Sequence, residues 1–505
     1  MDKISQYINK NRWIEWLLFA VVFWLCIVNL HLNRGLNDMI PGYHYWRKTD
    51  TYAQIMNYYF NGLNFFDHGI YYNQMNSGGK AVAEFPLFYY LVAIQKTIFG
   101  NHDIILKINW LVVMFFGQFA LFKIALDYTK NYLLSLIVPL ALFLSPTYVI
   151  YCIEFLPDPI ALHFGFIGFY FLSSYFRRKR NESLVFALLF FSLSGMMKPF
   201  FLVPYIAFLI TYFIYILLQK QKLKQIVIWL IPFGMVALWF LYVGWYNQSV
   251  KSHYFLAKLK PIWNETLENR ESIWSKIETK WLSTYFHEGY YWVIIVIAII
   301  TILLSERKNW TNRIFFIFSL LGSVTFFTLL FGMLRQHDYY IFPLLFLVPL
   351  TLLYFANTVR LKFNKWVSYS LGTLLLLGVY LGSTNSWHER NRRLRVPRIN
   401  AVENFTPYLG LDSFLNRHGV GVDDFIFAFS DKSPTYALML MNRKGWSGFQ
   451  TYYKAFTAEK LMNMGAKYAI INKALPQKKD SLAFENVTLQ YVADTNQIFI
   501  YKLFK

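Results

Sequence analysis

Residues 226–246 read Ile226-Val-Ile-Trp-Leu-Ile-Pro-Phe-Gly-Met-Val-Ala-Leu-Trp-Phe-Leu-Tyr-Val-Gly-Trp-Tyr246, an apolar run without a charged residue. A helix needs about 20 mostly apolar residues to cross the hydrocarbon core of a bilayer, and this run is long enough. The composition agrees, since 56% of the 505 residues are hydrophobic and only 15% are charged. The sequence therefore predicts a polytopic membrane protein.

Similar runs recur along the chain, and we expect about 11 transmembrane helices with end errors of a few residues. The expected spans are 13–30, 104–126, 132–150, 159–176, 184–197, 200–218, 226–245, 291–304, 314–333, 341–357 and 366–383. The run 85–99 is shorter and contains Gln95 and Lys96, which favours an interfacial or re-entrant helix. The predicted fold class is mainly α.

Basic residues in short loops set the expected orientation, because such loops prefer the cytoplasm. A cytoplasmic N-terminus places these basic residues inside: Lys130, Arg177, Arg178, Lys179, Arg180, Lys220, Lys222, Lys224, Arg307, Lys308, Arg313, Arg360, Lys362 and Lys365. Two long loops, about 31–103 and 246–290, and the polar tail then lie outside. A cluster after the last span opposes this tendency, so either the last run does not span or, as we expect, the cluster binds external phosphates: Arg390, Arg392, Arg393, Arg395 and Arg398.

The tail from residue 384 to 505 predicts a small extracytoplasmic α/β domain after a membrane domain of residues 1–383. Strands are expected at 425–430 and 468–472, and helices at 433–441 and 458–464. The segments 489–492 and 497–503 bracket a turn and predict a hairpin.

Charge and cysteine content exclude two classes of function. The net charge is +21, but the basic residues are scattered in short loops rather than gathered on one polar module, so we expect no nucleic-acid binding. Cys26 and Cys152 lie in or beside apolar segments and offer neither a disulfide framework nor the spacing of a metal site.

Residues able to do chemistry lie at the ends of the apolar runs. On the expected topology they all fall on the outer side: Asp50, Glu84, Asp158, Lys198, Arg335 and His337. Carboxylates and cations gathered at one membrane surface suit a charged substrate carried by a lipid.

The order of four short motifs resembles a known family. Arg47-Lys-Thr-Asp50-Thr and Glu84-Phe-Pro-Leu frame the first outer loop, and Pro157-Asp-Pro and Lys198-Pro follow. With these motifs, residues 1–345 resemble bacterial membrane glycosyltransferases of the GT-C fold. The nearest group is protein-O-mannosyltransferase-like and aminoarabinose-transferase-like, or glycosyltransferase family 39-like. Lys48 departs from the pattern, since relatives often have an uncharged residue there. The resemblance therefore does not identify the substrate.

The resemblance implies that Asp50 is the catalytic base and that Arg47 binds substrate or its phosphate. The chemistry agrees, since an acceptor hydroxyl must lose a proton as it attacks the anomeric carbon. An alternative is that Asp50 caps a helix over 51–60.

Two more acids are expected at the site. Glu84 precedes an apolar segment and could position a sugar hydroxyl or bind a cation, or simply favour a helix N-terminus. No spacing demands a metal, so a divalent ion at Glu84 stays open. Asp158, between two prolines at a turn that ends the third helix, is expected to support catalysis rather than only cap a helix.

Cations and aromatic residues are expected to hold the donor. Lys198 at the outer end of a short helix predicts a phosphate partner, although a lysine reaching the interface is the alternative. Arg335 and His337, and more weakly Tyr340, could stabilise charge on the leaving phosphate, or form an aromatic turn with solvated charges.

The sequence thus predicts a glycosyltransferase that moves a sugar from a polyprenyl-phosphate donor to a lipid, lipid-linked glycan or protein acceptor in a bacterial inner membrane. A transporter or flippase of lipid-linked saccharides is the alternative, but it usually has charges near the bilayer midplane and repeated halves. A non-catalytic scaffold would leave the outer acids without a role.

Overall fold

The computed structural model describes residues 12–36, 44–255, 259–304, 310–454, 456–473 and 482–505. Arg307 and Lys308, used above for orientation, lie outside these residues. The chain splits into two compact units, of which the first is Met1–Asn37, Lys107–Leu238 and Lys258–Arg392 and the second is Asp38–Leu106, Trp239–Ala257 and Arg393–Lys505. The predicted boundary at residue 384, between the membrane domain and the polar tail, stays a prediction.

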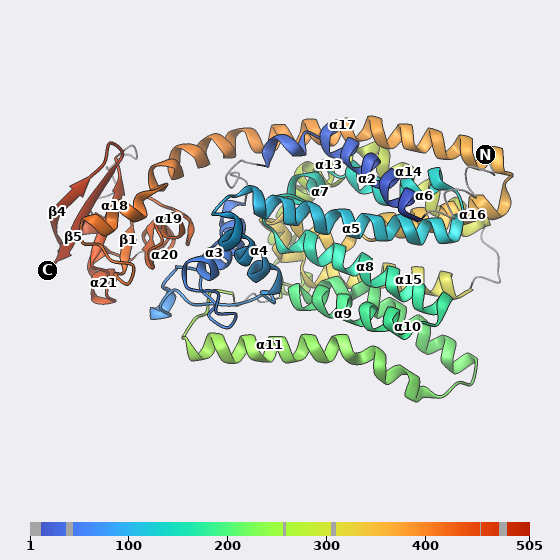
Figure 1. The fold of residues 1–505 in the computed structure, drawn as a ribbon, viewed down its shortest axis with the longest axis horizontal. Helices are drawn as coiled ribbons and strands as arrows, with labels where there is room; N and C mark the ends of the chain where they lie inside the picture. The colour runs from blue at the N-terminus through green and yellow to red at the C-terminus, as the bar shows by residue number, and fades with distance from the viewer. Residues whose placement is uncertain (1–11, 37–43, 256–258, 305–309, 455, 474–481) are drawn as a thin grey trace. The chain divides into compact units, whose positions relative to one another are not determined.

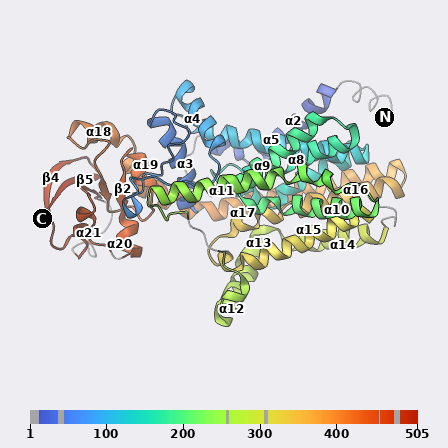
Figure 2. The same ribbon diagram turned by 90° about the horizontal axis from the view of Figure 1, so that it is seen from below.

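Helices make up the first unit (Figure 1). The helix α8 lies beside α9 (Figure 1), and α10 lies beside α15 (Figure 2). The helices that lie wholly or largely in this unit are α2 (Arg12–Asn29), α5 (Ile104–Thr129), α6 (Tyr132–Leu140), α7 (Pro146–Tyr151), α8 (Pro157–Arg178), α9 (Asn181–Met197), α10 (Val203–Leu218), α12 (Leu267–Lys276), α13 (Leu282–Tyr285), α14 (Glu288–Leu304), α15 (Trp310–Leu329), α16 (Leu347–Lys362) and α17 (Lys365–Phe405). The helix α11 (Ile231–Ser249) is divided between the units, with residues 239–249 in the second.

Every predicted span contains a helix, and the protein is a multi-pass membrane protein of mainly helical fold. Within the described residues, seven helices are long and apolar enough to cross a membrane, or up to eight if one bent pair is a single span. This is fewer than the 11 expected, because three of the expected spans fall on apolar helices that are shorter, and the run 85–99, not counted among the 11, forms a fourth short helix. The four short helices are Trp13–Asn29, Leu87–Phe99, Tyr132–Leu144 and Asn181–Met197.

Prolines explain why the predicted span 132–150 is broken. Pro139 lies inside α6, which gives way to a 3-10 turn at Ala141–Leu144, because proline cannot donate the helical hydrogen bond. Ser145 then caps α7 by accepting from the Tyr148 N–H, and Pro146 occupies the first turn of that helix.

The long loop predicted at 246–290 is largely helical. The stretch Leu267–Tyr285 lies at an angle of 79° to α14. In Figure 2, α12 forms the protruding end of this stretch, beyond α13. Trp281 is buried and donates to the Leu334 carbonyl at 2.8 Å, whereas Trp263 is 59% exposed. Trp281 therefore anchors the segment to the turn that contains Leu334.

The last expected span belongs to a helix that is longer than predicted. This helix, α17, continues through the arginine cluster to Phe405. Arg390 and Arg393 are buried, and Arg392 forms two hydrogen bonds with Glu389, at 2.6 and 2.8 Å. The cluster is therefore not a uniformly exposed patch for external phosphates.

The second unit combines the first long loop with Trp239–Ala257 and the tail. The loop supplies α3 (Tyr45–Phe60) and α4 (Leu87–Phe99), and the tail supplies α18 (Leu411–Arg417), α19 (Tyr436–Leu440), α20 (Gly448–Lys454) and α21 (Ala458–Asn463). In α4, Lys96 is buried, donates to Asn101 Oδ1 at 2.6 Å and forms an ion pair with Asp103 at 3.4 Å, so its charge is paired.

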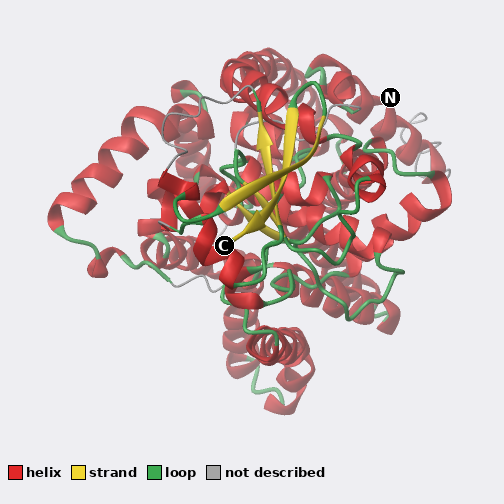
Figure 3. Cartoon of the chain, turned by 90° about the vertical axis from the view of Figure 1, so that its left-hand side faces the viewer, coloured by secondary structure: helices red, strands yellow, loops and turns green. Residues whose placement is uncertain are grey.

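A mixed five-stranded sheet lies at the centre of the tail (Figure 3). Its order is β2-β1-β3-β5-β4, with β1 parallel to both β2 and β3, and with β5 antiparallel to β3 and β4. The strands are β1 (Ile426–Ala428), β2 (Gly445–Ser447), β3 (Tyr468–Asn472), β4 (Thr488–Asp494) and β5 (Ile498–Phe504). The predicted α/β tail and hairpin are confirmed, whereas β2 was not predicted.

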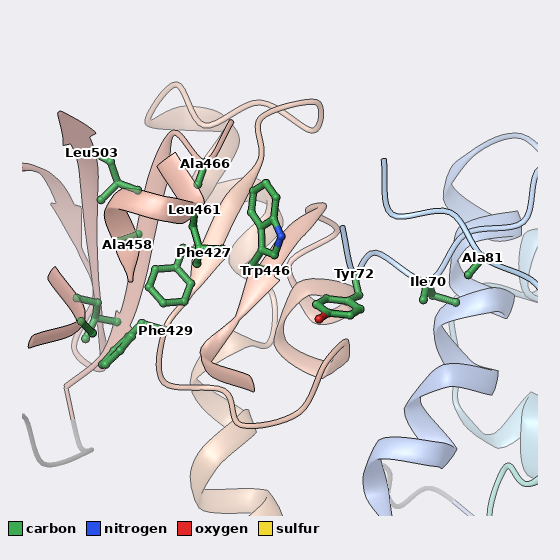
Figure 4. Packing of buried hydrophobic residues seen from close by; sticks show 13 residues of the cluster. Ile70, Tyr72, Ala81, Phe427, Phe429, Trp446, Ala458, Leu461, Ala466 and Leu503 are labelled. Atoms are coloured by element: carbon green, nitrogen blue, oxygen red, sulfur yellow. The ribbon is translucent and has the colours of Figure 1, made fainter. Parts of the chain in front are cut away.

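First-loop residues pack into the hydrophobic core of the tail. Trp446, Phe427 and Leu461 form that core with Tyr72 of the loop (Figure 4). The N–H of Gly445 donates to the Tyr71 carbonyl at 3.0 Å. Gly445 has φ 148°, and a Cβ there would lie 2.0 Å from the Ile426 carbonyl oxygen, so only glycine allows this close pairing.

Candidate active site

The helix α3 carries Asp50 in its interior. It begins at Tyr45, whereas the sequence predicted a helix starting at residue 51. Asp50 therefore does not cap this helix, and the capping interpretation is wrong. The side chain is buried, with 5% of the residue exposed.

Two side chains hold the Asp50 carboxylate. The Tyr254 hydroxyl donates to Oδ1 at 2.8 Å, and Arg47 Nη1 lies 3.7 Å from Oδ2. Tyr254 is itself packed against Tyr72, with ring centroids 5.4 Å apart, and Phe255 lies beneath the Arg47 guanidinium. The segment that contains Tyr254 and Phe255 thus braces both the acid and its cation.

The surroundings of Asp50 suit a base. Burial raises its pKa from 3.8 to about 7, while Arg47 and the Tyr254 hydroxyl oppose that rise and Glu84 adds to it. A base transfers protons best when its pKa lies near the working pH. Asp50 can therefore accept a proton from an acceptor hydroxyl near neutral pH.

Glu84 joins the same cluster through Arg47. Arg47 Nη2 donates to Glu84 Oε1 in a buried ion pair. The other oxygen, Oε2, is buried and has no hydrogen-bond partner in the described part of the chain. The first turn of α4 contains no acid and its cap is Pro86, so Glu84 does not serve that helix terminus. Its second oxygen can accept from a substrate hydroxyl.

Sequence reasoning missed two residues of this cluster. Tyr254 lies in a loop without any motif, so nothing in the sequence pointed to it. Gln54 follows Asp50 by four residues, hence on the same face of α3, and its buried amide has no hydrogen-bond partner among the described residues. That spacing was a usable signal once the helix was recognised.

Lys198 is the centre of a second cluster, in the first unit. It caps the C-terminus of α9, and its Nζ donates to both Asp158 oxygens at 2.7 and 2.8 Å. The ammonium also lies over two tyrosine rings, 5.4 Å from the centroid of Tyr339 and 5.6 Å from that of Tyr340. We call Lys198, Asp158, Tyr339 and Tyr340 the lysine cage.

Asp158 begins a helix instead of ending one, which corrects the sequence interpretation. Pro157 and Asp158 form the first turn of α8, where prolines and acids are favoured. The residue is 1% exposed and its carboxylate is matched by Lys198. Asp158 therefore positions the lysine rather than acting as a free acid.

His337 lies beside the cage. Its ring centroid is 5.2 Å from that of Tyr339 and 5.9 Å from that of Tyr340. The next residue, Asp338, is buried and accepts from the Tyr151 hydroxyl at 2.8 Å, which fixes the turn. The predicted segment 335–340 thus does supply aromatic residues around a cation.

Arg335 belongs to different surroundings. Its side chain is 41% exposed, its Nη2 lies 3.9 Å from Glu265 Oε2, and its carbonyl accepts from Lys276. Both partners come from the segment around α12. The Arg335 side chain therefore lies at the surface of its unit.

The predicted site residues fall into two groups. The second unit brings Arg47, Asp50 and Glu84 together, and the first unit brings Asp158, Lys198, His337 and Tyr340 together. Among the described residues, no three His, Cys, Asp or Glu side chains gather closely enough to hold a metal ion. A metal at Glu84 stays a prediction.

Comparisons with known proteins identify the fold. A scan against protein-family models finds no match, and a search of curated proteins finds none either. The chain is similar to solved structures of ArnT from Cupriavidus metallidurans. The form bound to undecaprenyl phosphate gives a TM-score of 0.58 at 10% identity over 97% of this chain and 98% of that chain. The apo form gives 0.57 at 10% identity over 98% of each chain.

An archaeal protein shares the same architecture. The oligosaccharyltransferase AglB from Archaeoglobus fulgidus, in complex with an inhibitory peptide and a dolichol-phosphate, gives a TM-score of 0.51 at 11% identity. The match covers 92% of this chain and 70% of AglB. The chain therefore has the GT-C fold that its sequence motifs implied.

Proposed function

We propose that the protein is an integral membrane glycosyltransferase. It transfers a sugar from a polyprenyl-phosphate donor to a lipid, lipid-linked glycan or protein acceptor at the outer face of the inner membrane. The observation that carries the proposal is Asp50, a buried carboxylate with a pKa near 7 that is held by Tyr254 and Arg47. A scaffold or a passive channel has no need of such a base.

The proposed reaction is a single displacement. The acceptor oxygen attacks the anomeric carbon of the sugar and forms a new C–O bond. The bond from that carbon to the phosphate oxygen breaks, and polyprenyl phosphate leaves with the electron pair. Asp50 takes the proton of the acceptor hydroxyl.

The other residues bind and stabilise. Glu84 Oε2 accepts from a sugar or acceptor hydroxyl, and Arg47 keeps both acids in place. Lys198 and Arg335 offset the charge that develops on the leaving phosphate. Asp158 already neutralises Lys198, so phosphate competes with it for the ammonium, and Tyr339 and Tyr340 keep the cation in place.

The resemblance to ArnT bound to undecaprenyl phosphate and to AglB with dolichol-phosphate supports a polyprenyl-phosphate ligand. The orientation proposed from the basic loops has the N-terminus in the cytoplasm and residues 384–505 outside. Cysteine labelling of Asp423→Cys in intact cells tests that orientation. An impermeant reagent is expected to label it, and labelling only after lysis would reverse the topology.

The function is tested with purified protein in liposomes and a panel of polyprenyl-phosphate sugars. Each candidate acceptor is supplied as an extract of the host envelope. Wild type is expected to release polyprenyl phosphate and form one labelled glycan. The variant Asp423→Asn, which changes an exposed acid of the same unit, serves as a matched control for Asp50→Asn. Movement of intact donor across the bilayer without sugar transfer would instead support the flippase.

A further inference from the structure

Three side chains of the tail lie next to the Asp50 cluster. They are Thr435, at the N-cap of α19, and Phe449 and Gln450 in α20. We call these three residues the tail brace. They belong to the same compact unit as Asp50 and Tyr254.

Two contacts of the tail brace hold the helix that carries Asp50. The Thr435 hydroxyl donates to Thr49 Oγ1 at 3.0 Å, and the Thr49 hydroxyl donates to the Trp46 carbonyl at 2.7 Å. The Phe449 ring lies perpendicular to the Trp46 ring, with centroids 5.4 Å apart. Because Trp46 and Thr49 belong to the first turns of α3, the tail fixes the backbone from which the Asp50 side chain extends.

Two further contacts of the tail brace hold Tyr72, the ring on which Tyr254 packs. Gln450 Nε2 donates to the Tyr72 hydroxyl, and Phe449 lies perpendicular to the Tyr72 ring at 6.1 Å between centroids. The Tyr72 and Tyr254 centroids are 5.4 Å apart, and the Tyr254 hydroxyl donates to Asp50 Oδ1 at 2.8 Å. The tail therefore also fixes the hydroxyl that binds the carboxylate.

Backbone pairing sets which way Tyr72 faces. Gly445 of β2 donates its N–H to the Tyr71 carbonyl at 3.0 Å and accepts from the Asn73 N–H at 2.6 Å, so residues 71–73 run parallel to β2. A shift of this pairing by one residue would turn Tyr72 to the opposite face. With the observed pairing, Tyr72 points into the tail core beside Trp446 (Figure 4).

We propose that the tail positions the catalytic base, because it holds both the helix of Asp50 and the tyrosine that donates to the Asp50 carboxylate. The inference rests on the proposed function and gives the tail a role in it. Tyr72 acts through Tyr254, and Thr435 acts through Thr49, so both are positioning residues. A hydrogen bond to a charged group weakens steeply when its geometry is lost. Loss of this support should therefore change how Asp50 takes up a proton.

Substitutions in the full-length protein test the positioning role. Tyr72→Leu removes the ring that packs on Tyr254, and Gln450→Leu is the milder change, since it removes only the hydrogen bond to Tyr72. We expect kcat to fall about tenfold in the first variant and about threefold in the second, with the donor KM within about twofold of wild type. Gln450→Leu decides alone if Tyr72→Leu does not reach the membrane.

A double substitution separates positioning from a loss of stability. Because Tyr72→Leu acts through the Tyr254 hydroxyl, adding it to Tyr254→Phe should lower kcat by less than a further twofold or so, whereas independent effects would multiply. Phe427→Leu is the matched control, since Phe427 belongs to the same tail core. It should lower the unfolding temperature and keep kcat within about twofold of wild type. Effects that multiply, or an equal loss of kcat in the control, would overturn the inference.

Infrared titration of Asp50 gives a readout that needs no sugar transfer. The charged and titratable groups that act on Asp50 are Arg47, Glu84 and Tyr254, and the Tyr254 hydrogen bond lowers its pKa. Subtraction of the Asp50→Asn spectrum isolates the Asp50 carboxyl band from that of Asp431, whose pKa is also about 7. In both tail variants this band should persist to higher pH than in wild type. A midpoint that is unmoved in both, or moved to lower pH, would overturn the inference.

The two proposals fail in different ways. If wild type transfers no polyprenyl-phosphate sugar but the infrared midpoint moves as expected, the proposed function is wrong and the tail still positions Asp50. If wild type transfers sugar while Tyr72→Leu and Gln450→Leu keep its kcat and its infrared midpoint, the tail has no positioning role.

Discussion

Asp50 and Asp158 are both buried aspartates on helices, yet the structure surrounds them differently. Asp158 gives both oxygens to Lys198, at 2.7 and 2.8 Å. Asp50 has a hydroxyl on one oxygen and a guanidinium 3.7 Å from the other, and burial raises its pKa to about 7. A carboxylate whose charge is fully matched holds a cation in place, whereas one that is only partly matched can take up a proton.

This difference assigns the two acids to different tasks. The lysine cage is a stable cation site, because the acid and two aromatic rings fix the ammonium before any ligand arrives. In the Asp50 cluster, Glu84 Oε2 and the Gln54 amide have no hydrogen-bond partner among the described residues, so they remain able to bind a ligand. The first suits phosphate, and the second suits sugar and acceptor hydroxyls.

The largest expected effect comes from Asp50→Asn. Loss of the base should lower kcat about a thousandfold, since general base catalysis contributes about 10²–10⁴, with donor affinity and folding unchanged. Asp158→Asn should instead destabilise the protein by about 2 kcal/mol, because the half-buried Lys198 ammonium loses its charged partner. Measurements of kcat and of the thermal unfolding temperature of both variants test this difference. Equal losses of kcat together with equal unfolding temperatures would contradict the separate roles of the two acids.

Lys198→Met should have the next largest effect. Removal of the ammonium is expected to raise the donor KM about thirtyfold, about 2 kcal/mol, as for a charge-assisted contact. The acceptor KM should stay within about twofold of wild type. Initial rates at varied donor and acceptor test this, and an effect on acceptor alone would remove Lys198 from the phosphate.

The pH dependence gives a smaller effect. Asp50 must be ionised to accept a proton, so activity should be low below pH 7 and rise through its pKa of about 7. The Tyr254 hydroxyl lowers that pKa, so Tyr254→Phe should move the rise in activity to higher pH. A profile that falls with pH, or an unmoved midpoint in the variant, would contradict the assignment.

Arg335→Ala should have the smallest effect. The side chain is 41% exposed and its ion pair with Glu265 spans 3.9 Å, so its removal should leave thermal unfolding unchanged. The donor KM is expected to rise less than about fivefold, or about 1 kcal/mol. A larger loss than that of Lys198→Met would make Arg335 the principal phosphate ligand.

The sequence predicted much of the fold, because helix spans and the tail follow from local patterns. Apolar runs gave the long helices of the first unit but not α12 or α13, and short apolar segments beside a turn gave β3 and the β4–β5 hairpin. It could not give β2, a three-residue strand that is defined by its pairing with β1, about 20 residues away along the chain. It also overestimated the count of full spans, since Pro139 breaks one of them.

The same difference between local patterns and contacts distant in sequence applies to the candidate site. The motifs located Asp50, Glu84 and Lys198, because their neighbours in sequence were informative. The contacts that define their chemistry are distant in sequence, as between Asp50 and Tyr254 or Lys198 and Tyr339. Asp158 was expected to take part in catalysis, and only its two bonds to Lys198 indicate a positioning role.

The envelope glycans of a strain that carries only Asp50→Asn test the account most directly. Wild-type, Asp50→Asn and Asp423→Asn strains are compared by mass spectrometry of their lipid-linked glycans and polyprenyl-phosphate sugars. The account predicts that Asp50→Asn alone removes one sugar from one glycan and accumulates the matching polyprenyl-phosphate sugar. Glycans and donor lipids identical to wild type, with the variant present in the membrane, would contradict it.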